Sequence, residues 1–192
     1  MPSNTISRRS LALSLAALPA GLAMAADEST KASNATARAT AAAADGLSHT
    51  SEMILQEVTL TAGPQRVYEA LTRSKDFDMI TRLSDGAALL AAAGAKPTAI
   101  STEVGGPFTL FGGYVTGRHL EMLPGERLVQ AWRAGSWKPG EFSVAAFYLA
   151  AEVGGKTKLR FEHRGFPNGE GATLAHGWHV HYWEPLAKFL AA

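Results

Sequence analysis

The sequence predicts an α+β protein in which a curved antiparallel sheet of about six to seven strands wraps around one long C-terminal helix. Two short helices are expected after the first strand. Strand-like segments separated by glycine turns follow one another over residues 99–164, which is typical of an antiparallel meander. A strongly apolar helical stripe then runs from Gly171 to Leu190. Because one helix must cover so wide a sheet, the sheet has to curl around it.

The C-terminal helix is indicated by apolar residues that recur every four positions. We expect Thr173 to cap its first turn, since a threonine hydroxyl can accept from an unpaired amide. Gly177 interrupts the helix at a cost of about 1 kcal/mol relative to alanine. Pro185 removes an amide donor and should bend the axis. The stripe comprises Leu174, Trp178, Tyr182, Leu186, Phe189 and Leu190.

The elements before the meander are shorter. A first strand is predicted over residues 53–60, followed by helices over 64–72 and 75–82. The alanine- and leucine-rich stretch 87–95 is either a short helix or a mobile loop, and it lies where a lid would sit. The six further strands are expected at 99–104, 108–111, 114–123, 127–133, 142–153 and 157–164.

The first 25 residues read as an export signal. Arg8 and Arg9 precede an apolar run over residues 11–23, and Ala23-Met24-Ala25 is a small-x-small cleavage pattern. The run is shorter than the about 20 residues that span a membrane. The arginine pair resembles a twin-arginine signal, while a Sec signal or an uncleaved anchor are the alternatives. We therefore expect a periplasmic or secreted protein.

The remaining chain divides into two parts. Residues 26–51 are rich in alanine, threonine and serine without hydrophobic periodicity, so we expect a disordered tether. Residues 52–192 then form a single domain, because a chain of 192 residues with 46% apolar content can bury one core.

Composition excludes several kinds of function. The chain has no cysteine, which rules out disulfides, thiolate metal sites and cysteine nucleophiles. Its 18 basic and 17 acidic residues become 16 and 17 once the two arginines of residues 1–25 are removed, so we expect no nucleic-acid partner and no stable membrane span. Serine-nucleophile, zinc-protease and phosphate-loop motifs are absent from the sequence. We expect no cofactor, and the oligomeric state stays open.

Five short motifs occur in order along residues 53–190, and together they resemble the START-like (SRPBCC, helix-grip) superfamily. More closely, they are similar to bacterial proteins related to the C-terminal domain of the Hsp90 ATPase activator. The motifs are Gly105-Gly106-x-Phe108, Gly117 with Glu121 and Leu123-Pro124, Glu126-Arg127-Leu128-Val129-x-x-Trp132, Thr157-x-Leu159-x-Phe161-x-His163-x-Gly165-Phe166, and Gly177-Trp178 with Tyr182-Trp183-x-Pro185-Leu186.

The resemblance implies a hydrophobic cavity between sheet and helix. Members of the superfamily bind lipids, hormones or polyketides, and a few catalyse cyclisation, hydration or hydrolysis. The co-chaperone role belongs to eukaryotic relatives, whose cytosolic chaperone an exported protein would not meet. The first hypothesis is therefore a non-catalytic binder of a small hydrophobic ligand. The alternatives are an enzyme that uses a histidine as acid or base, and an interaction module like the Hsp90 activator.

Six residues are candidates for the ligand site. Phe147 and Phe161 fall on alternate positions of neighbouring strands and face inward, although simple core packing explains them equally well. His163 shares the face of Phe161 and is expected at the cavity rim, where it would bond a ligand carbonyl, act as a general base, or be satisfied by backbone or water. The full set is Trp132, Phe147, Phe161, His163, Trp178 and Tyr182.

A histidine cluster in the C-terminal helix raises the question of a metal. His176 and His179 are helical neighbours, whereas His181 points away from them. A metal site would need a third ligand such as His163 or His119. A polar outer face explains the cluster better, and we expect no metal.

Overall fold

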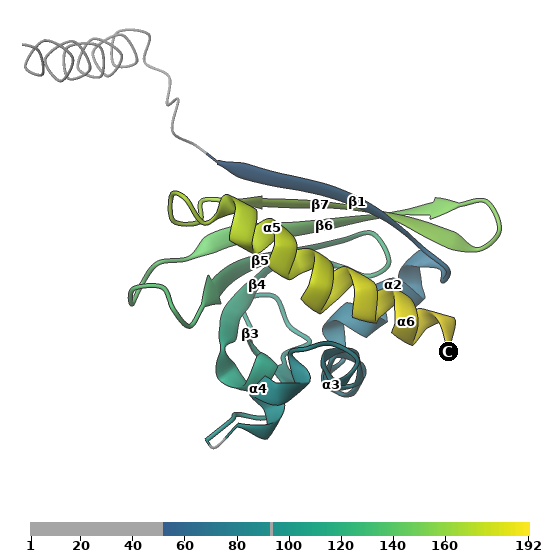
Figure 1. Ribbon diagram of the computed structural model, residues 1–192. Coiled ribbons are helices and arrows are strands. Elements are labelled where there is room, and N and C mark those ends of the chain that lie inside the picture. Colours follow the sequence, from purple (N-terminus) through teal and green to yellow (C-terminus); the bar gives the residue numbers. More distant parts are fainter. Residues whose placement is uncertain (1–51, 93) are drawn as a thin grey trace, which may run out of the picture. The chain divides into compact units, whose positions relative to one another are not determined.

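The computed structural model describes residues 52–92 and 94–192 (Figure 1). The predicted export signal over 1–25 and the predicted tether over 26–51 lie outside these residues. The described chain contains a seven-stranded antiparallel sheet in the order β1-β7-β6-β5-β4-β3-β2. The C-terminal helix crosses one face of this sheet (Figure 1). The predicted helix-grip architecture is confirmed.

The strands alternate between buried and exposed residues, as expected when one sheet face is covered. In β5, for example, every second residue from Leu128 to Ala134 is buried. The strand predicted over 99–104 is shorter than expected, because Gly105 (φ +79°) and Gly106 turn the chain back toward β3. The strands are β1 Met53–Leu60, β2 Ala99–Ile100, β3 Pro107–Leu110, β4 Val115–Leu123, β5 Arg127–Ala134, β6 Ser143–Glu152 and β7 Lys156–Arg164.

Short helices follow the first strand, as predicted. For the stretch 87–95, the sequence left open a short helix or a mobile loop. Residues 87–91 form a short helix, α4. The helical elements before the last strand are α2 Pro64–Thr72, α3 Ser74–Arg82, α4 Ala87–Ala91 and the 3-10 turn η1 Phe111–Gly113.

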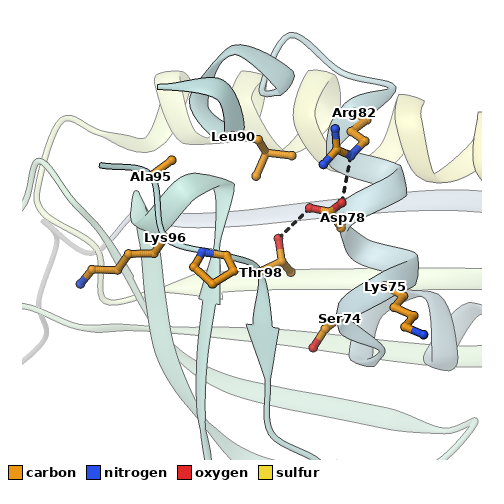
Figure 2. A pocket seen from close by; sticks show the side chains of 9 residues that line it. Ser74, Lys75, Asp78, Arg82, Leu90, Ala95, Lys96 and Thr98 are labelled. Carbon is orange, nitrogen blue, oxygen red and sulfur yellow. Dashed lines mark hydrogen bonds and ion pairs between the residues drawn. The ribbon is translucent and has the colours of Figure 1, made fainter. Parts of the chain in front are cut away.

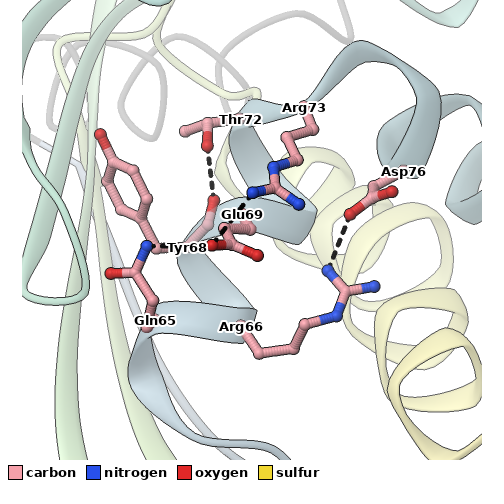
Figure 3. A network of polar contacts seen from close by, with 7 residues as sticks. All are labelled: Gln65, Arg66, Tyr68, Glu69, Thr72, Arg73 and Asp76. Atoms are coloured by element: carbon pink, nitrogen blue, oxygen red, sulfur yellow. Dashed lines mark hydrogen bonds and ion pairs between the residues drawn. The ribbon is translucent and has the colours of Figure 1, made fainter.

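An ion pair links the first two helices, α2 and α3, and a second one lies at the end of α2 (Figure 3). Arg66 of α2 pairs with Asp76 of α3 at 2.7 Å, and its guanidinium lies 4.9 Å from the ring centre of Phe189 near the C-terminus. Glu69 pairs with Arg73 at 3.2 Å. Exposed pairs of this kind contribute little to stability individually.

The C-terminal helix is continuous but contains one wide turn. It consists of α5 (Gly171–Trp178), the π-helical turn η2 (His179–Trp183) and α6 (Glu184–Ala191). Pro185 lies in the first turn of α6, directly after the wide turn. A π turn interrupts the regular α-helical hydrogen bonding, so the missing amide of Pro185 falls where that bonding is already interrupted.

The prediction that Thr173 caps this helix is wrong. The helix begins at Gly171, and the carboxylate of Glu52 accepts hydrogen bonds from the amides of Gly169 (3.0 Å) and Gly171 (3.1 Å). A carboxylate at a helix N-terminus also interacts favourably with the helix dipole. A residue distant in sequence therefore replaces the local cap.

The C-terminal helix directs three large aromatic side chains into the core: Trp178 of α5, and Tyr182 and Trp183 of the wide turn. The ring of Trp178 lies 4.1 Å from Tyr182 and 4.2 Å from Phe161, and it stacks on Trp183 at 5.7 Å. Trp183 is 3% exposed. A regular 3.6-residue period would turn Trp183 off the apolar face, which is why the predicted stripe omitted it.

His163 joins this helix to the sheet. Indole nitrogen Nε1 of Trp178 donates to Nδ1 of His163 at 3.0 Å, and Nε2 of His163 lies 2.7 Å from Oγ of Ser143. The Ser143 hydroxyl donates to the carbonyl of Trp132 at 3.0 Å. Since an indole only donates, Nδ1 must accept, and the single proton of the neutral imidazole sits on Nε2 and points to Ser143.

The prediction that His163 lies at a cavity rim is wrong. Its side chain is fully buried. The two-residue alternation correctly gives its inward face, but it does not reveal that Phe166 and Trp178 cover the imidazole, with ring centres 5.2 and 5.5 Å away. Burial lowers the pKa of His163 to about 3, because the apolar surroundings disfavour the charged form.

The low pKa of His163 should make stability depend on pH. The unfolded chain, with a histidine pKa of about 6.5, binds more protons than the folded chain between that value and 3, so the free energy of unfolding should fall as the pH drops. We expect His163→Gln to reduce this slope by up to about 1.4 kcal/mol per pH unit between about pH 4 and 5.5. Urea unfolding at several pH values measures it; identical slopes for both proteins would contradict the assignment.

Gly117 allows β4 to pack closely against its neighbours. A Cβ there would overlap the carbonyl oxygen of Ala131 and the ring of Phe108. We expect Gly117→Ala to lower the free energy of unfolding by about 1–3 kcal/mol, as overpacking does. Gly63→Ala is the matched control, since its Cβ would meet no atom within 4 Å and should change stability by less than about 0.5 kcal/mol. Equal urea midpoints for the two variants would refute this account.

Candidate functional site

A cavity of about 190 Å³ lies between α5, the strands β4 and β5, and the α4–η1 region. Its walls are mostly aromatic and aliphatic, with a few polar groups, which is the usual character of a small-molecule site. Two of its lining residues, Ala134 and Gly177, have little or no side-chain volume. The lining residues are Leu89, Phe111, Tyr114, Val115, Trp132, Ala134, Ser136, Trp137, Glu170, Thr173, Leu174, Gly177, Trp178, His181 and Tyr182.

Half of the predicted ligand residues reach this cavity. Trp132, Trp178 and Tyr182 line it. Phe147 instead borders a void of about 10 Å³ deeper in the core. Phe161 has no exposed surface and packs on Trp178. Together with His163, these side chains fill the space beneath the helix on the β6–β7 side, so the cavity is confined to the β4–β5 side.

Phe111 is a wall residue that the sequence pattern did not single out. It is buried, and its ring centre lies 5.2 Å from Tyr182 and 5.5 Å from Phe77, edge-on in both cases. Its φ is +50°, a left-handed conformation that costs a bulky residue of order 1–3 kcal/mol and is often found at functional sites. A Cβ at the next residue, Gly112, would overlap the carbonyl oxygen of Leu89, so α4 rests directly on this turn.

Two polar side chains in the wall were also missed as ligand candidates. Trp137 lies in the loop after β5, and His181 lies in η2, where it was expected to point away. Nε1 of Trp137 and Nδ1 of His181 are buried without a hydrogen-bond partner. A tryptophan inside a glycine- and proline-rich loop is the one sequence signal for Trp137, because such loops are usually polar. His181 lies four residues after Gly177 and three after Trp178, so helical spacing places it on the same face as these two wall residues.

The indole N–H of Trp132, another polar group of the aromatic wall, has a hydrogen-bond partner within the protein. Nε1 of Trp132 donates to the phenol oxygen of Tyr182 at 3.4 Å. Burial raises the pKa of Tyr182 well above its ordinary value, so the phenol stays protonated at neutral pH. The wall is therefore uncharged where these two rings meet.

The other histidines do not assemble a metal site in the described part of the chain. His179 pairs with Glu184 at 3.1 Å. His119 of β4 is fully buried beside Phe108 of β3. Burial lowers the pKa of His119, and the nearby backbone of Ser101 opposes this shift. Over residues 52–92 and 94–192, no three histidine, aspartate or glutamate side chains gather as metal ligands would.

A wider cleft of about 470 Å³ lies between α3 and the segment before β2 (Figure 2). Its walls carry Lys75, Arg82 and Lys96, all exposed. Asp78 pairs with Arg82 at 2.9 Å and accepts from Thr98 at 3.4 Å. Because this cleft is open and its acidic group is already paired with exposed neighbours, the smaller apolar cavity is the better candidate site.

None of the helices in residues 52–92 and 94–192 is long and apolar enough to cross a membrane.

Several known proteins are similar to this domain in sequence or in fold. The chain is 27% identical over 139 residues to the mouse protein named Activator of 90 kDa heat shock protein ATPase homolog 1; the aligned part is 72% of this chain but 37% of that relative. Its fold is similar to that of an HSP90 activator from Plasmodium falciparum, at a TM-score of 0.62 and 18% identity, over 72% of this chain and 96% of the other. A protein from Chromobacterium violaceum is similar at a TM-score of 0.58 and 22% identity, over 73% and 97% of the two chains.

The match to a described protein family assigns this chain to that family. The family described as Activator of Hsp90 ATPase homolog 1-like protein matches residues 61–191, which run from the start of the turn before α2 to the end of α6. The match therefore includes every element that lines the cavity, and the chain belongs to the Activator of Hsp90 ATPase homolog 1-like family.

Proposed function

We propose that this protein is an exported, non-catalytic binder of a small hydrophobic ligand. The observation that carries the proposal is the 190 Å³ cavity beside α5. An engineered apolar cavity of about 150 Å³ is large enough to bind benzene, so this space suits a compound of about one ring. Trp132, Trp178 and Tyr182 supply large flat surfaces against which such a compound would pack.

Export is the second part of the proposal. It rests on the paired arginines, the apolar run and the small-x-small pattern of residues 1–25. Amino-terminal sequencing of the protein from the cell envelope tests it, with a new terminus after Ala25 as the expected result.

The acid–base alternative receives no support from the geometry. Both ring nitrogens of His163 are engaged, by Trp178 and Ser143, and the imidazole is fully buried. A general base must lie within hydrogen-bond reach of the proton that it removes. We therefore favour binding over catalysis.

An interaction with an Hsp90 chaperone is the second candidate, favoured by the family assignment. The mouse relative carries the activator name, but the aligned part is about a third of that protein. Finding the protein in the cytosol with residues 1–25 intact would favour this candidate over the ligand binder.

Filling the cavity should abolish binding without harming the fold. Gly177 lines the cavity, and a Cβ there would lie 3.9 Å from Cδ2 of His181, an ordinary van der Waals contact. We expect Gly177→Leu to prevent binding of toluene in an NMR titration, since its side chain occupies the space. The matched control Gly177→Ala should keep binding and gain up to about 1 kcal/mol of stability, because alanine favours helix.

Native mass spectrometry of protein purified from its own cell envelope provides an independent test. A retained small molecule, absent from the Gly177→Leu protein, is the expected result. Toluene binding that is unaffected by Gly177→Leu would show that the cavity is not the site.

A further inference from the structure

We propose that the ligand of this cavity is a neutral compound with a hydrogen-bond-accepting oxygen, and that the indole N–H of Trp137 binds this oxygen. The inference rests on the proposed function and specifies the ligand class for the same cavity. It is argued from the hydrogen bonds of the four tryptophans and from the charges around the cavity.

The four tryptophans differ in whether the indole N–H has a hydrogen-bond partner. All four lie in the described part of the chain. Nε1 of Trp132 donates to Tyr182, that of Trp178 to His163, and that of Trp183 to Gln56 at 2.6 Å. Nε1 of Trp137 is buried and has no partner, although the residue is only 5% exposed.

An unpartnered buried donor is unfavourable. Leaving it unpaired sacrifices the hydrogen bond that it would make with water, and native proteins rarely retain such groups without a reason. An indole N–H can only donate, so its missing partner must be an acceptor. Because Trp137 lines the cavity, a ligand held there is in a position to supply one.

A second unpartnered atom lies in the same wall. Nδ1 of His181 is also buried without a partner. An imidazole nitrogen donates or accepts depending on its tautomer, so it suits a hydroxyl or a carbonyl equally well. An apolar pocket with a few polar groups is the arrangement that orients a ligand rather than merely enclosing it.

The charges of the wall favour a neutral ligand. Among the lining residues, all within the described part of the chain, only Glu170 belongs to the acidic or basic residues Asp, Glu, Lys and Arg. A carboxylate ligand would approach this group without a basic partner, and burying an unpaired charge is strongly unfavourable. The matching class is therefore a small neutral ketone, phenol or ether.

A pair of probes of nearly equal shape tests the inference. Acetophenone carries a carbonyl where α-methylstyrene carries a methylene group, so only acetophenone can accept from Trp137. Affinities are measured by NMR titration of the purified protein and of Trp137→Phe, which removes the N–H but keeps an aromatic side chain. We expect the substitution to shift the ratio of the two dissociation constants about three- to tenfold against acetophenone.

Trp183→Phe is the control, since it makes the same chemical change at an indole that does not line the cavity; its ratio should match that of the wild type. In the wild type, acetophenone should move the indole proton resonance of Trp137 downfield, while α-methylstyrene should not. This measurement uses the wild-type protein, so it tests the hydrogen bond even if Trp137→Phe is unstable.

Four results would overturn the inference. An unchanged ratio in Trp137→Phe, or equal shifts of the indole resonance with both probes, would exclude the hydrogen bond while leaving the cavity a binding site. Tighter binding of benzoate than of acetophenone would exclude the neutral class. Failure of both probes to bind would overturn the proposed function together with this inference.

Discussion

A chain of hydrogen bonds through His163 fastens the C-terminal helix to the sheet beside the cavity. The chain runs from the indole of Trp178 through His163 to Ser143 and ends on the backbone of Trp132. Every proton along it has one allowed place, because the first donor is an indole. Buried networks of this kind are rigid when every member is satisfied. Trp178 therefore holds a fixed orientation, and one face of its ring forms the wall of the cavity.

The distribution of side-chain volume explains why space remains on only one side of this helix. Toward β6 and β7, Phe147 and Phe161 pack against Trp178 and Trp183 at ring distances of 4.2 to 6.2 Å. On the β4–β5 side, the small residues Ala134 and Gly177 line the cavity. Protein interiors are normally filled to high density, so an apolar hollow bordered by a strained Phe111 is a local exception to that rule.

Sequence reasoning recovered the architecture because it depends on simple periods. Alternation and glycine turns defined most strands, and the four-residue stripe placed Trp178 and Tyr182 on the buried face. The wall residues were harder to predict. Phe111 contributes through a left-handed backbone that no regular period indicates, and Trp137 lies in the loop after β5, outside any helix or strand. The position of His163 required knowing what covers the sheet, which is set by contacts between distant residues rather than by its strand.

The wide turn also divides the C-terminal helix into two parts with different constraints. The part before it, from Gly171 to Trp178, supplies Thr173, Leu174 and Gly177 to the cavity. The part after it packs against the short helices near the start of the domain, where Phe189 lies against Arg66. A π turn corresponds to one residue added to an α-helix. Substitutions at Thr173, Leu174 or Gly177 would therefore change the shape of the cavity while the carboxyl-terminal part keeps its packing.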